Sequence, residues 1–257
     1  MRKIFISFFI LIALILSSSS AFADNKIKIG IIGAMDIEVD SLKQNAKISN
    51  KIIIADMEFN EGMLDNVDVV IVKCGMGKVN AAICTQILIS NFGVTHVINT
   101  GVAGSLNNKL NVGDIVVAAD VVQHDYDVEP IGFKKGEIPY TGLVFFKADD
   151  KMRKKALETV KNFAPDIQVI EGRICTGDQF IATKEQKNKI ISNFGGDCCE
   201  MESGAIAQTC YLNNVPFVII RAISDKADET ETSDFHEFEP PTAKLCANIT
   251  EYMVKNF

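Results

Sequence analysis

Short runs of consecutive apolar residues, many of them β-branched, recur along the chain and alternate with stretches of helical periodicity. An apolar run without alternation is typical of a strand that is covered on both faces. The runs predict strands at residues 26–32, 67–73, 96–99, 114–122, 171–176 and 217–222. The periodic stretches predict helices at residues 37–45, 78–91, 151–163, 183–194, 203–213 and 241–256.

The order of these elements predicts the fold class. Because strands and helices alternate, we expect an α/β fold, a three-layer α/β/α sandwich around a mainly parallel mixed sheet. Thr183 with Gln186, as in a capping box, and Pro241 support two of the helix starts. Residues 123–145 lack regular periodicity and should form a loop over one end of the sheet. Ligands in such folds bind at the carboxyl ends of the strands, so the chemistry should lie there.

The first 23 residues have the pattern of an export signal. Two basic residues precede the apolar stretch 4–16, and small residues allow cleavage after Ala23. An uncleaved membrane anchor is the alternative, but the stretch is shorter than the ~20 residues that span a bilayer. We therefore expect a signal peptide at 1–23 and an exported protein, periplasmic or extracellular. Residues 24–257 have the size of one large domain.

Charge and cysteine content narrow the class of protein. Without the signal peptide, 24 basic residues stand against 33 acidic ones, a net charge of −9 that disfavours nucleic-acid binding. The seven cysteines are odd in number, have no metal-ligand spacing and lie mostly in apolar runs. We expect buried free thiols rather than a disulfide scaffold. This usage is typical of a reducing compartment and conflicts mildly with the export signal.

Acidic residues follow three of the predicted strands, and a glycine-rich turn at 99–106 follows a fourth. The acids are Asp36 and Glu38, then Glu200 and Glu202 in the stretch CCEMES, and finally Asp225. Any one of them has a structural interpretation, because acids are favourable near helix starts. The glycines let backbone N–H groups approach a ligand closely. Together these strand ends predict a pocket that is negative and partly apolar.

Such a pocket suits a reaction that develops positive charge. Cleavage at the anomeric carbon of a sugar passes through an oxocarbenium-like state. Carboxylates stabilise that state while one activates water and another protonates the leaving group. Metal-dependent hydrolysis is less favoured, because His96, His124 and His236 have no ligand spacing to one another. We therefore expect neither a metal nor a cofactor.

The motifs resemble those of a known family over nearly all of residues 28–257. They are similar to the bacterial 5′-methylthioadenosine/S-adenosylhomocysteine nucleosidases of the purine nucleoside phosphorylase superfamily. The resemblance implies hydrolysis of an N-glycosidic bond with release of adenine, on a nucleoside phosphorylase-like fold. The motifs are IGIIGAMDIEV, GMGKVNAA, INTGVAGSL, VGDIVVA, HDYDV, TGDQFI, EMES, VPFVIIRAISDKAD and SDFHEF.

Roles for individual residues follow from this resemblance. It implies that Glu38 activates the attacking water and that Asp225 protonates the purine at N7, with Ser224 holding the Asp225 carboxyl group. Glu202 would accept hydrogen bonds from the ribose hydroxyls. The other substrate-binding candidates are Met35, Ala103, Gly104, Phe180, Ile181, Glu200, Met201, Arg221, Phe235, Val128 and Phe133.

Several of these candidates have distinct implied contacts. Phe180 would stack on the purine, and the backbone of Ile181 would read the purine edge. Met201 would pack against the sugar and the sulfur side. Glu200 has no clear role of its own, and a surface or supporting position stays open for it.

The resemblance also implies a second subunit. Phe235, together with Val128 and Phe133 of a neighbouring subunit, would close over the apolar 5′ substituent, so we expect a homodimer. One departure concerns Val102, since the family often has a serine there that contacts the region of the attacking water. Sequences with GVAGSL and QHD, as here, resemble nucleosidases that also accept aminodeoxyfutalosine. 5′-Deoxyadenosine is a further candidate substrate.

Two other functions remain open from the sequence. A phosphate-dependent nucleoside phosphorylase is disfavoured, because the turn after the first strand offers Asp36 and Glu38 but no arginine, and Arg221 alone would bind phosphate poorly among acids. An exported nucleoside-binding or adhesion protein on the same fold is the second alternative. A pure binder would have little use for all three catalytic acids.

Overall fold

The computed structural model describes residues 26–228 and 231–257, except for the side chains of 231–236. The expected signal peptide at 1–23 lies outside the described residues. Among the residues that are described, no helix has the length and apolar character needed to cross a bilayer.

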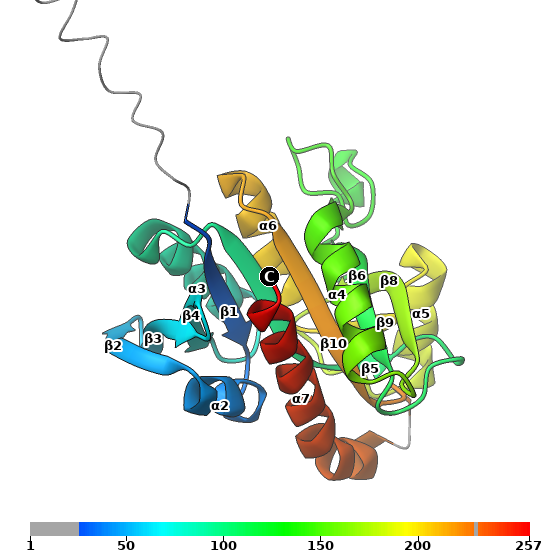
Figure 1. The fold of residues 1–257 in the computed structure, drawn as a ribbon. Helices are drawn as coiled ribbons and strands as arrows, with labels where there is room; N and C mark the ends of the chain where they lie inside the picture. Colours follow the sequence, from blue (N-terminus) through cyan, green and yellow to red (C-terminus); the bar gives the residue numbers. More distant parts are fainter. Residues whose placement is uncertain (1–25, 229–230) are drawn as a thin grey trace, which may run out of the picture.

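Strands from the whole described chain form one mixed sheet, which confirms the expected α/β class (Figure 1). Its central strands β5, β1 and β4 run parallel, and β3 and β2 extend it as antiparallel neighbours. The strands are β1 (Lys28–Gly33), β2 (Lys47–Ile54), β3 (Met57–Leu64), β4 (Val67–Lys73), β5 (His96–Ser105), β6 (Ile115–Gln123), β7 (Phe146–Lys147), β8 (Val169–Thr176), β9 (Cys198–Glu200) and β10 (Phe217–Asp225).

One half of the sheet closes on itself. β10 pairs with β5 on one side and with β6 on the other, while β8 and β9 connect β6 back to β5. The carboxyl ends of β5, β9 and β10 therefore meet at one mouth instead of spreading along an open edge. This closure is what brings the acidic strand ends together.

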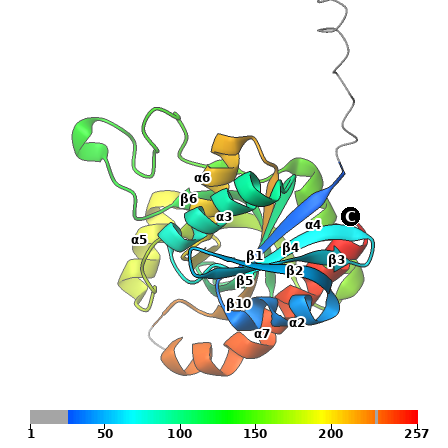
Figure 2. The same cartoon turned by 90° about the vertical axis from the view of Figure 1, so that its left-hand side faces the viewer.

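Helices cover both faces of the sheet (Figure 2). One layer contains α7, which contacts both α2 and α4. The other layer contains the contacting pair α3 and α6, with α5 beside β8. The helices are α2 (Asp36–Asn45), α3 (Lys78–Phe92), α4 (Asp150–Phe163), α5 (Lys184–Phe194), α6 (Ser203–Asn213) and α7 (Glu231–Lys255).

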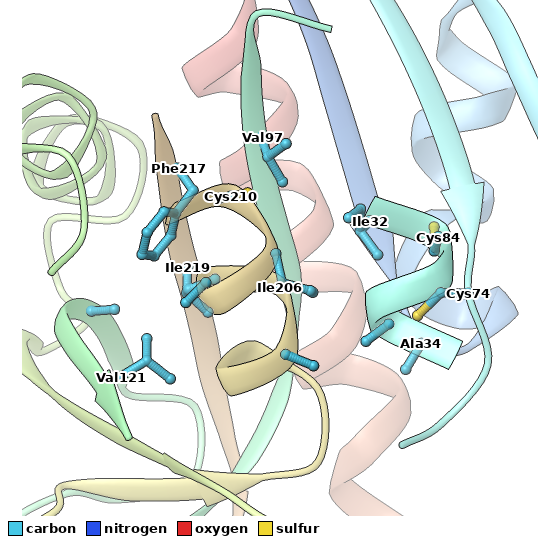
Figure 3. Close-up of a cluster of buried hydrophobic side chains, with 14 of the residues drawn as sticks. Ile32, Ala34, Cys74, Cys84, Val97, Val121, Ile206, Cys210, Phe217 and Ile219 are labelled. Carbon is cyan, nitrogen blue, oxygen red and sulfur yellow. The ribbon is translucent and has the colours of Figure 1, made fainter. Parts of the chain in front are cut away.

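The apolar runs of the strands fill two large cores, one under each helical layer, and a smaller third cluster packs against α5. Successive side chains of a strand point to opposite faces. Ile31 accordingly packs in the core under α2 and α7, and its neighbour Ile32 packs in the core under α3 and α6. Figure 3 shows the second core, in which Ile206 and Cys210 of α6 lie close to the strands. All seven cysteines are buried free thiols, as expected.

Four strands differ from the sequence prediction, which placed no strand at β2, β3, β7 or β9. The hairpin β2–β3 was not predicted, because β2 is a largely exposed edge strand without a long apolar run. Its turn places both Ala55 and Asp56 at positive φ, as a type I′ turn requires, without the glycine that usually marks such a turn. The loop expected at 123–145 is confirmed, with only the short 3₁₀ turn η1 (Glu129–Ile131) and an isolated bridge inside it.

The start predicted for the last helix is wrong. α7 begins at Glu231, so Pro241 lies inside the helix next to Pro240 rather than in its first turn. Neither proline has an N–H group to donate to the carbonyl four residues before it, so two hydrogen bonds of the helix are missing at this point. Figure 1 shows the helix bending between its orange and red parts.

Candidate active site

The principal pocket opens at the mouth formed by the strand ends, and its free volume is about 590 Å³ when the open entrance is included. It is lined by Ala34, Met35, Glu38, Met76, Val102, Ala103, Gly104, Gln179, Phe180, Ile181, Cys199, Glu200, Met201, Glu202, Ser224 and Asp225. The pocket therefore contains nearly all the residues predicted from the sequence.

Glu38 lies in the first turn of α2 and is 3% exposed. Its Oε2 accepts the N–H groups of Ala34 (2.6 Å) and Met35 (3.0 Å), and its Oε1 accepts the N–H of Val102 (3.1 Å). Burial raises the pKa of Glu38, although Arg221 and these three N–H groups oppose the rise. The site thus holds a fixed carboxylate whose proton affinity is higher than usual, which suits a general base.

Gly101 of β5 allows Glu38 and Arg221 to approach each other. A Cβ at this glycine would lie only 2.5 Å from Arg221 Nη1 and would also collide with Glu38 Oε1. Any side chain at position 101 would therefore displace the base or the cation.

Arg221, on β10, is the cation at the centre of the acidic cluster and is 2% exposed. Its Nη2 donates to Asn99 Oδ1 (2.5 Å), to Glu200 Oε2 (2.5 Å) and to the hydroxyl of Ser203 (2.9 Å). Burial alone would lower the pKa of Arg221, but Glu200, Glu202 and Glu38 raise it above its ordinary value. The guanidinium is therefore charged and committed mainly to Glu200.

Glu200 is a buried supporting acid and not a surface residue. Its Oε2 also accepts the N–H groups of Glu202 (3.1 Å) and Ser203 (2.9 Å) at the start of α6, and its Oε1 accepts the hydroxyl of Thr176. Burial would raise the pKa of Glu200, but Arg221 and the hydrogen bonds from Thr176 and Ser203 outweigh it and lower the pKa. Both carboxylate oxygens are occupied by protein donors. Glu200 thus fixes α6 and Arg221, and any direct contact with a ligand stays a prediction.

Glu202 has the opposite electrostatic setting although it lies two positions further on. It is 6% exposed, accepts the N–H of Gly77 (2.8 Å) and lies 3.9 Å from Arg221 Nη2. Burial and the charge of Glu200 raise the pKa of Glu202 to about 8, against the weaker effects of Arg221 and the Gly77 N–H. As predicted, Glu202 lies directly at the start of a helix, α6, and lines the pocket.

Asp225, at the end of β10, lines another part of the pocket and is 3% exposed. Its Oδ2 accepts the Ser224 hydroxyl (2.7 Å) and its Oδ1 accepts the N–H of Ala227 (3.0 Å). The predicted pairing of Ser224 with the acid is therefore present. Gly104 makes room for it, because a Cβ there would lie 2.7 Å from Asp225 Oδ1.

Apolar side chains form the remaining walls. Phe180 is half exposed, at 49%, whereas Ile181 is buried, and both follow β8. Met35 and Met201 are partly buried and line the pocket with Ala103. The arrangement gives an aromatic face and thioether walls beside a ring of carboxylates.

Three predicted residues, Val128, Phe133 and Arg221, are not among the residues that line the pocket. Val128 and Phe133 lie on the 123–145 loop, away from the pocket of their own chain, and the ring of Phe133 contacts that of Tyr140. Figure 2 shows this loop, in green, projecting from the body of the molecule. The side chain of Phe235 lies outside the described residues.

The pocket also contains residues that the motifs alone did not identify as contacts, chiefly Met76, Cys199 and Gln179. Met76 stands between two glycines of GMGKVNAA, which was a usable signal for a turn close to a ligand. Cys199 was expected only to be a buried free thiol, and burial raises the pKa of its thiol, but Cys199 also lies on the pocket wall next to EMES. Within the described ranges, no group of three or more potential metal ligands was found.

Comparison with known proteins now defines the class of this fold and site. Residues 28–255 match the family described as the phosphorylase superfamily. The match covers almost the whole described chain, so the protein is a member of that superfamily.

Curated relatives narrow the class further. A 5′-methylthioadenosine/S-adenosylhomocysteine nucleosidase of Geobacillus is 42% identical over 231 residues, covering 89% of this chain and 98% of the relative. The Staphylococcus haemolyticus nucleosidase is 42% identical with similar coverage, 88% and 99%. The chain belongs to this nucleosidase family, whose members are N-glycosyl hydrolases.

Solved structures agree with this placement. A Colwellia psychrerythraea nucleosidase in complex with adenine is 38% identical, with a TM-score of 0.85, and the match covers 90% of this chain and 95% of that one. The futalosine hydrolase of Helicobacter pylori is 32% identical, with a TM-score of 0.86, and the match covers 90% and 99%.

Proposed function

We propose that the protein hydrolyses the N-glycosidic bond of 5′-methylthioadenosine and S-adenosylhomocysteine and releases adenine. The single observation that carries the proposal is the convergence of Glu38, Glu202 and Asp225, all at least 94% buried, on one pocket. The named relatives cover nearly the whole chain at 42% identity, which supports the same substrates.

The sugar end of the pocket supplies the base and the ribose contacts. Glu38 would orient water and accept its proton as the water attacks the anomeric carbon. Glu202 would bind the ribose hydroxyls next to it. The carboxylates would stabilise the positive charge that the sugar gains in the transition state, and burial strengthens that interaction.

The purine end supplies the acid. Asp225 would protonate the purine at N7, so that adenine leaves as a neutral molecule, while the Ser224 hydroxyl keeps the carboxyl group in place. Phe180 would stack on the purine face, and the backbone of Ile181 would read the purine edge. Met35 and Met201 would pack against the 5′ thioether side.

The charge of the sugar end favours water over phosphate as the nucleophile. Phosphorolysis would require cationic groups to bind a phosphate dianion. Arg221 is the cation that faces Glu38 across Gly101, and it is committed to Glu200 at 2.5 Å. A dianion placed there would face Glu38 and the charged Glu200 that already binds Arg221, and both carboxylates repel it.

Two further nucleosides are candidate substrates, 5′-deoxyadenosine and aminodeoxyfutalosine. The second is supported by the likeness to the Helicobacter pylori futalosine hydrolase and by the sequences GVAGSL and QHD. Val102 replaces the serine that the family often has, and its side chain lines the pocket where a hydroxyl would otherwise stand.

A homodimer is proposed to complete the pocket. Apolar side chains are exposed together on the contacting helices α3 and α6 and next to them, namely Met76, Val79, Ile83, Tyr211 and Leu212. Such a group of exposed apolar residues is typical of a protein interface. A second copy on this surface would let Val128 and Phe133 of its projecting loop close the neighbouring pocket. A monomer in sedimentation experiments would contradict this arrangement.

Export to the periplasm or the cell exterior is proposed from the signal-like residues 1–23 alone. The N-terminus of the protein purified from its native cells tests it. We expect the mature chain to begin at Asp24.

Adenine release from separate methylthioadenosine, adenosylhomocysteine, 5′-deoxyadenosine and aminodeoxyfutalosine solutions tests the proposed activity. We expect release without phosphate, a free reducing sugar as the second product, and no acceleration when phosphate is added. A sugar 1-phosphate product, or no release from any of the four, would show that the proposed hydrolysis is wrong.

A further inference from the structure

A cluster of charged groups outside the pocket joins three segments that border it. The Asp125 carboxylate, just after β6, accepts Lys78 Nζ at 2.7 Å and the N–H of Asp178 at 2.9 Å. Asp178 Oδ1 in turn accepts the N–H of Lys78 at 2.8 Å. We name these three residues the Lys78–Asp125–Asp178 clasp. They come from the start of α3, the end of β6 and the loop after β8.

Lys78 and Asp178 are each close in sequence to residues that contact or line the pocket. Gly77 immediately precedes Lys78 and donates its N–H to Glu202 Oε1 at 2.8 Å. The pocket residues 180–181 follow Asp178 in the same loop. The clasp therefore connects Gly77, which donates its N–H to Glu202, with residues 180–181, which form the proposed purine wall.

The backbone at Gly77 shows that this link imposes a special conformation. Its φ of 95° and ψ of 160° are almost restricted to glycine. A Cβ at this position would also approach Asp178 Oδ1 to 3.2 Å. Gly77 is the N-cap of α3 without any side-chain cap, so the first N–H groups of this helix are satisfied by the carboxylates of Glu202 and Asp178.

We propose that Asp125, with Lys78 and Asp178, is a positioning residue for the hydrolysis: the clasp holds the Gly77 N–H on Glu202 at a fixed separation from the purine wall. The inference rests on the proposed function. The side chains of Lys78 and Asp125 are each 19% exposed, so solvent screens their ion pair less than it screens a surface pair. Loss of the clasp should weaken substrate binding more than it slows proton transfer, because no member touches Glu38 or Asp225 in the hydrogen bonds and ion pairs described.

Asp125→Asn tests the proposal with little change in shape. One of the two donors on Asp125, Lys78 Nζ or the Asp178 N–H, would then face an amide NH₂ group. We expect KM for methylthioadenosine to rise about tenfold with a much smaller change in kcat, and the Kd for adenine to rise as well. Asp150→Asn is the matched control, because Asp150 makes an exposed ion pair with Arg153 at 2.9 Å on α4.

Substitutions of Lys78 test the ion pair with Asp125 independently of changes at Asp125. Lys78→Met should also raise KM, the double variant with Asp125→Asn should be no worse than the stronger single variant, and Lys78→Arg should restore most of the affinity. Should Asp125→Asn fail to fold, the two Lys78 variants carry the test, since they leave the backbone N–H of residue 78 in place.

Unchanged KM and unchanged adenine Kd in both folded variants would show that the clasp does not position the pocket. An inactive wild-type protein would instead contradict the proposed function. Adenine affinity measured by calorimetry would still test the clasp in that case, so the two failures are distinguishable.

Discussion

The sugar end and the purine end of the pocket are built in different ways. At the sugar end, Glu38 and Glu202 are at least 94% buried and accept hydrogen bonds from backbone N–H groups. The positive charge of Arg221 acts on both carboxyl groups. At the purine end, Phe180 is half exposed on a loop. The sugar end is therefore preformed by strand and helix ends, whereas the aromatic face at the purine end is half exposed to solvent.

This difference separates two kinds of contribution to catalysis. Preformed carboxylates act on the charge that develops in the transition state and should affect kcat. A half-exposed aromatic wall binds the base in substrate and transition state alike and should affect KM. Substitutions of the buried carboxylates, including Asp225, and of the aromatic wall should therefore have different kinetic signatures.

The largest effect on activity is expected from substitution of the proposed general base, Glu38. Glu38→Gln should lower kcat by ~10²–10⁴-fold, because the amide cannot accept a proton from water. Asp36→Asn is a suitable control, since Asp36 lies in the same helical turn but is exposed and paired with Lys73 at 2.8 Å. Single-turnover adenine release measures the loss. A Glu38→Gln enzyme within about threefold of wild type would contradict a role as general base.

A similar loss is expected at the acid, which is the one proton-transfer group of the purine end. Asp225→Asn should lower kcat by ~10²–10⁴-fold because the purine would have to leave without a proton. Adenine affinity, measured by calorimetry, should change much less, since the asparagine keeps the shape of the side chain. Undiminished turnover would refute the assignment of the acid.

Glu202→Gln should have an intermediate effect on activity. Glutamine replaces one carboxyl oxygen by an NH₂ group and so removes an acceptor for the ribose hydroxyls, which should reduce kcat/KM about 10- to 100-fold. Steady-state kinetics with methylthioadenosine measure this loss, and a variant with full kcat/KM would remove Glu202 from the ribose site.

The same substitution should also change stability with pH. The pKa of Glu202 is raised from its ordinary value of 4.5 to about 8. The folded state therefore binds the proton more tightly, and the wild type loses about 1.4 kcal/mol of unfolding free energy per pH unit between those values. Glu202→Gln lacks this loss, so it should be more stable than wild type at pH 8 and equal to it at pH 4.

Glu200→Gln sharpens this comparison because the sign is reversed. The pKa of Glu200 is lowered in the folded protein. The charged form of Glu200 therefore stabilises the fold at pH values above the pKa that Glu200 has in the unfolded chain, and this stabilisation is lost as the pH falls. The variant should be less stable than wild type at pH 8. Urea unfolding of the Glu200→Gln and Glu202→Gln variants at pH 4 and pH 8 measures these stabilities. If both substitutions changed the free energy of unfolding in the same direction at pH 8, the assigned charges would be contradicted.

The smallest effect is expected at the purine wall. Phe180→Ala should raise KM by roughly 2- to 10-fold, as expected for loss of an aromatic stacking contact, with little change in kcat. The melting temperature should stay close to that of wild type, because Phe180 is half exposed. A large fall in kcat with unchanged KM would contradict a role of Phe180 in binding the base.

The sequence predicted the parts of the site that depend on strand ends. Glu38 follows β1 and Asp225 lies at the end of β10, and both strands run parallel to β5, so their carboxyl ends lie at one edge. Glu202 follows β9, which is antiparallel to β5, so this rule does not place Glu202. The pairing of Ser224 with Asp225 was implied by the family resemblance and is present. The edge hairpin β2–β3 was missed because its exposed residues carry no apolar run.

The long-range contacts of Glu200 and Glu202 could not be predicted from the sequence. The partner of Glu202 is the N–H of Gly77, 125 positions away, and Glu200 receives Arg221 and Thr176 from two other strands. These contacts arise because β10 pairs with both β5 and β6 and closes half the sheet. Local periodicity cannot reveal that closure, so the different settings of two acids only two residues apart could not be predicted.

A crystal structure with a non-cleavable methylthioadenosine analogue tests the central claim most directly. We predict Glu38 on the face of the anomeric carbon opposite the base, Glu202 within hydrogen-bonding distance of the ribose hydroxyls, and Asp225 beside the purine N7. An analogue bound with any of these three carboxylates turned away from the ribosyl bond and its purine would contradict the account.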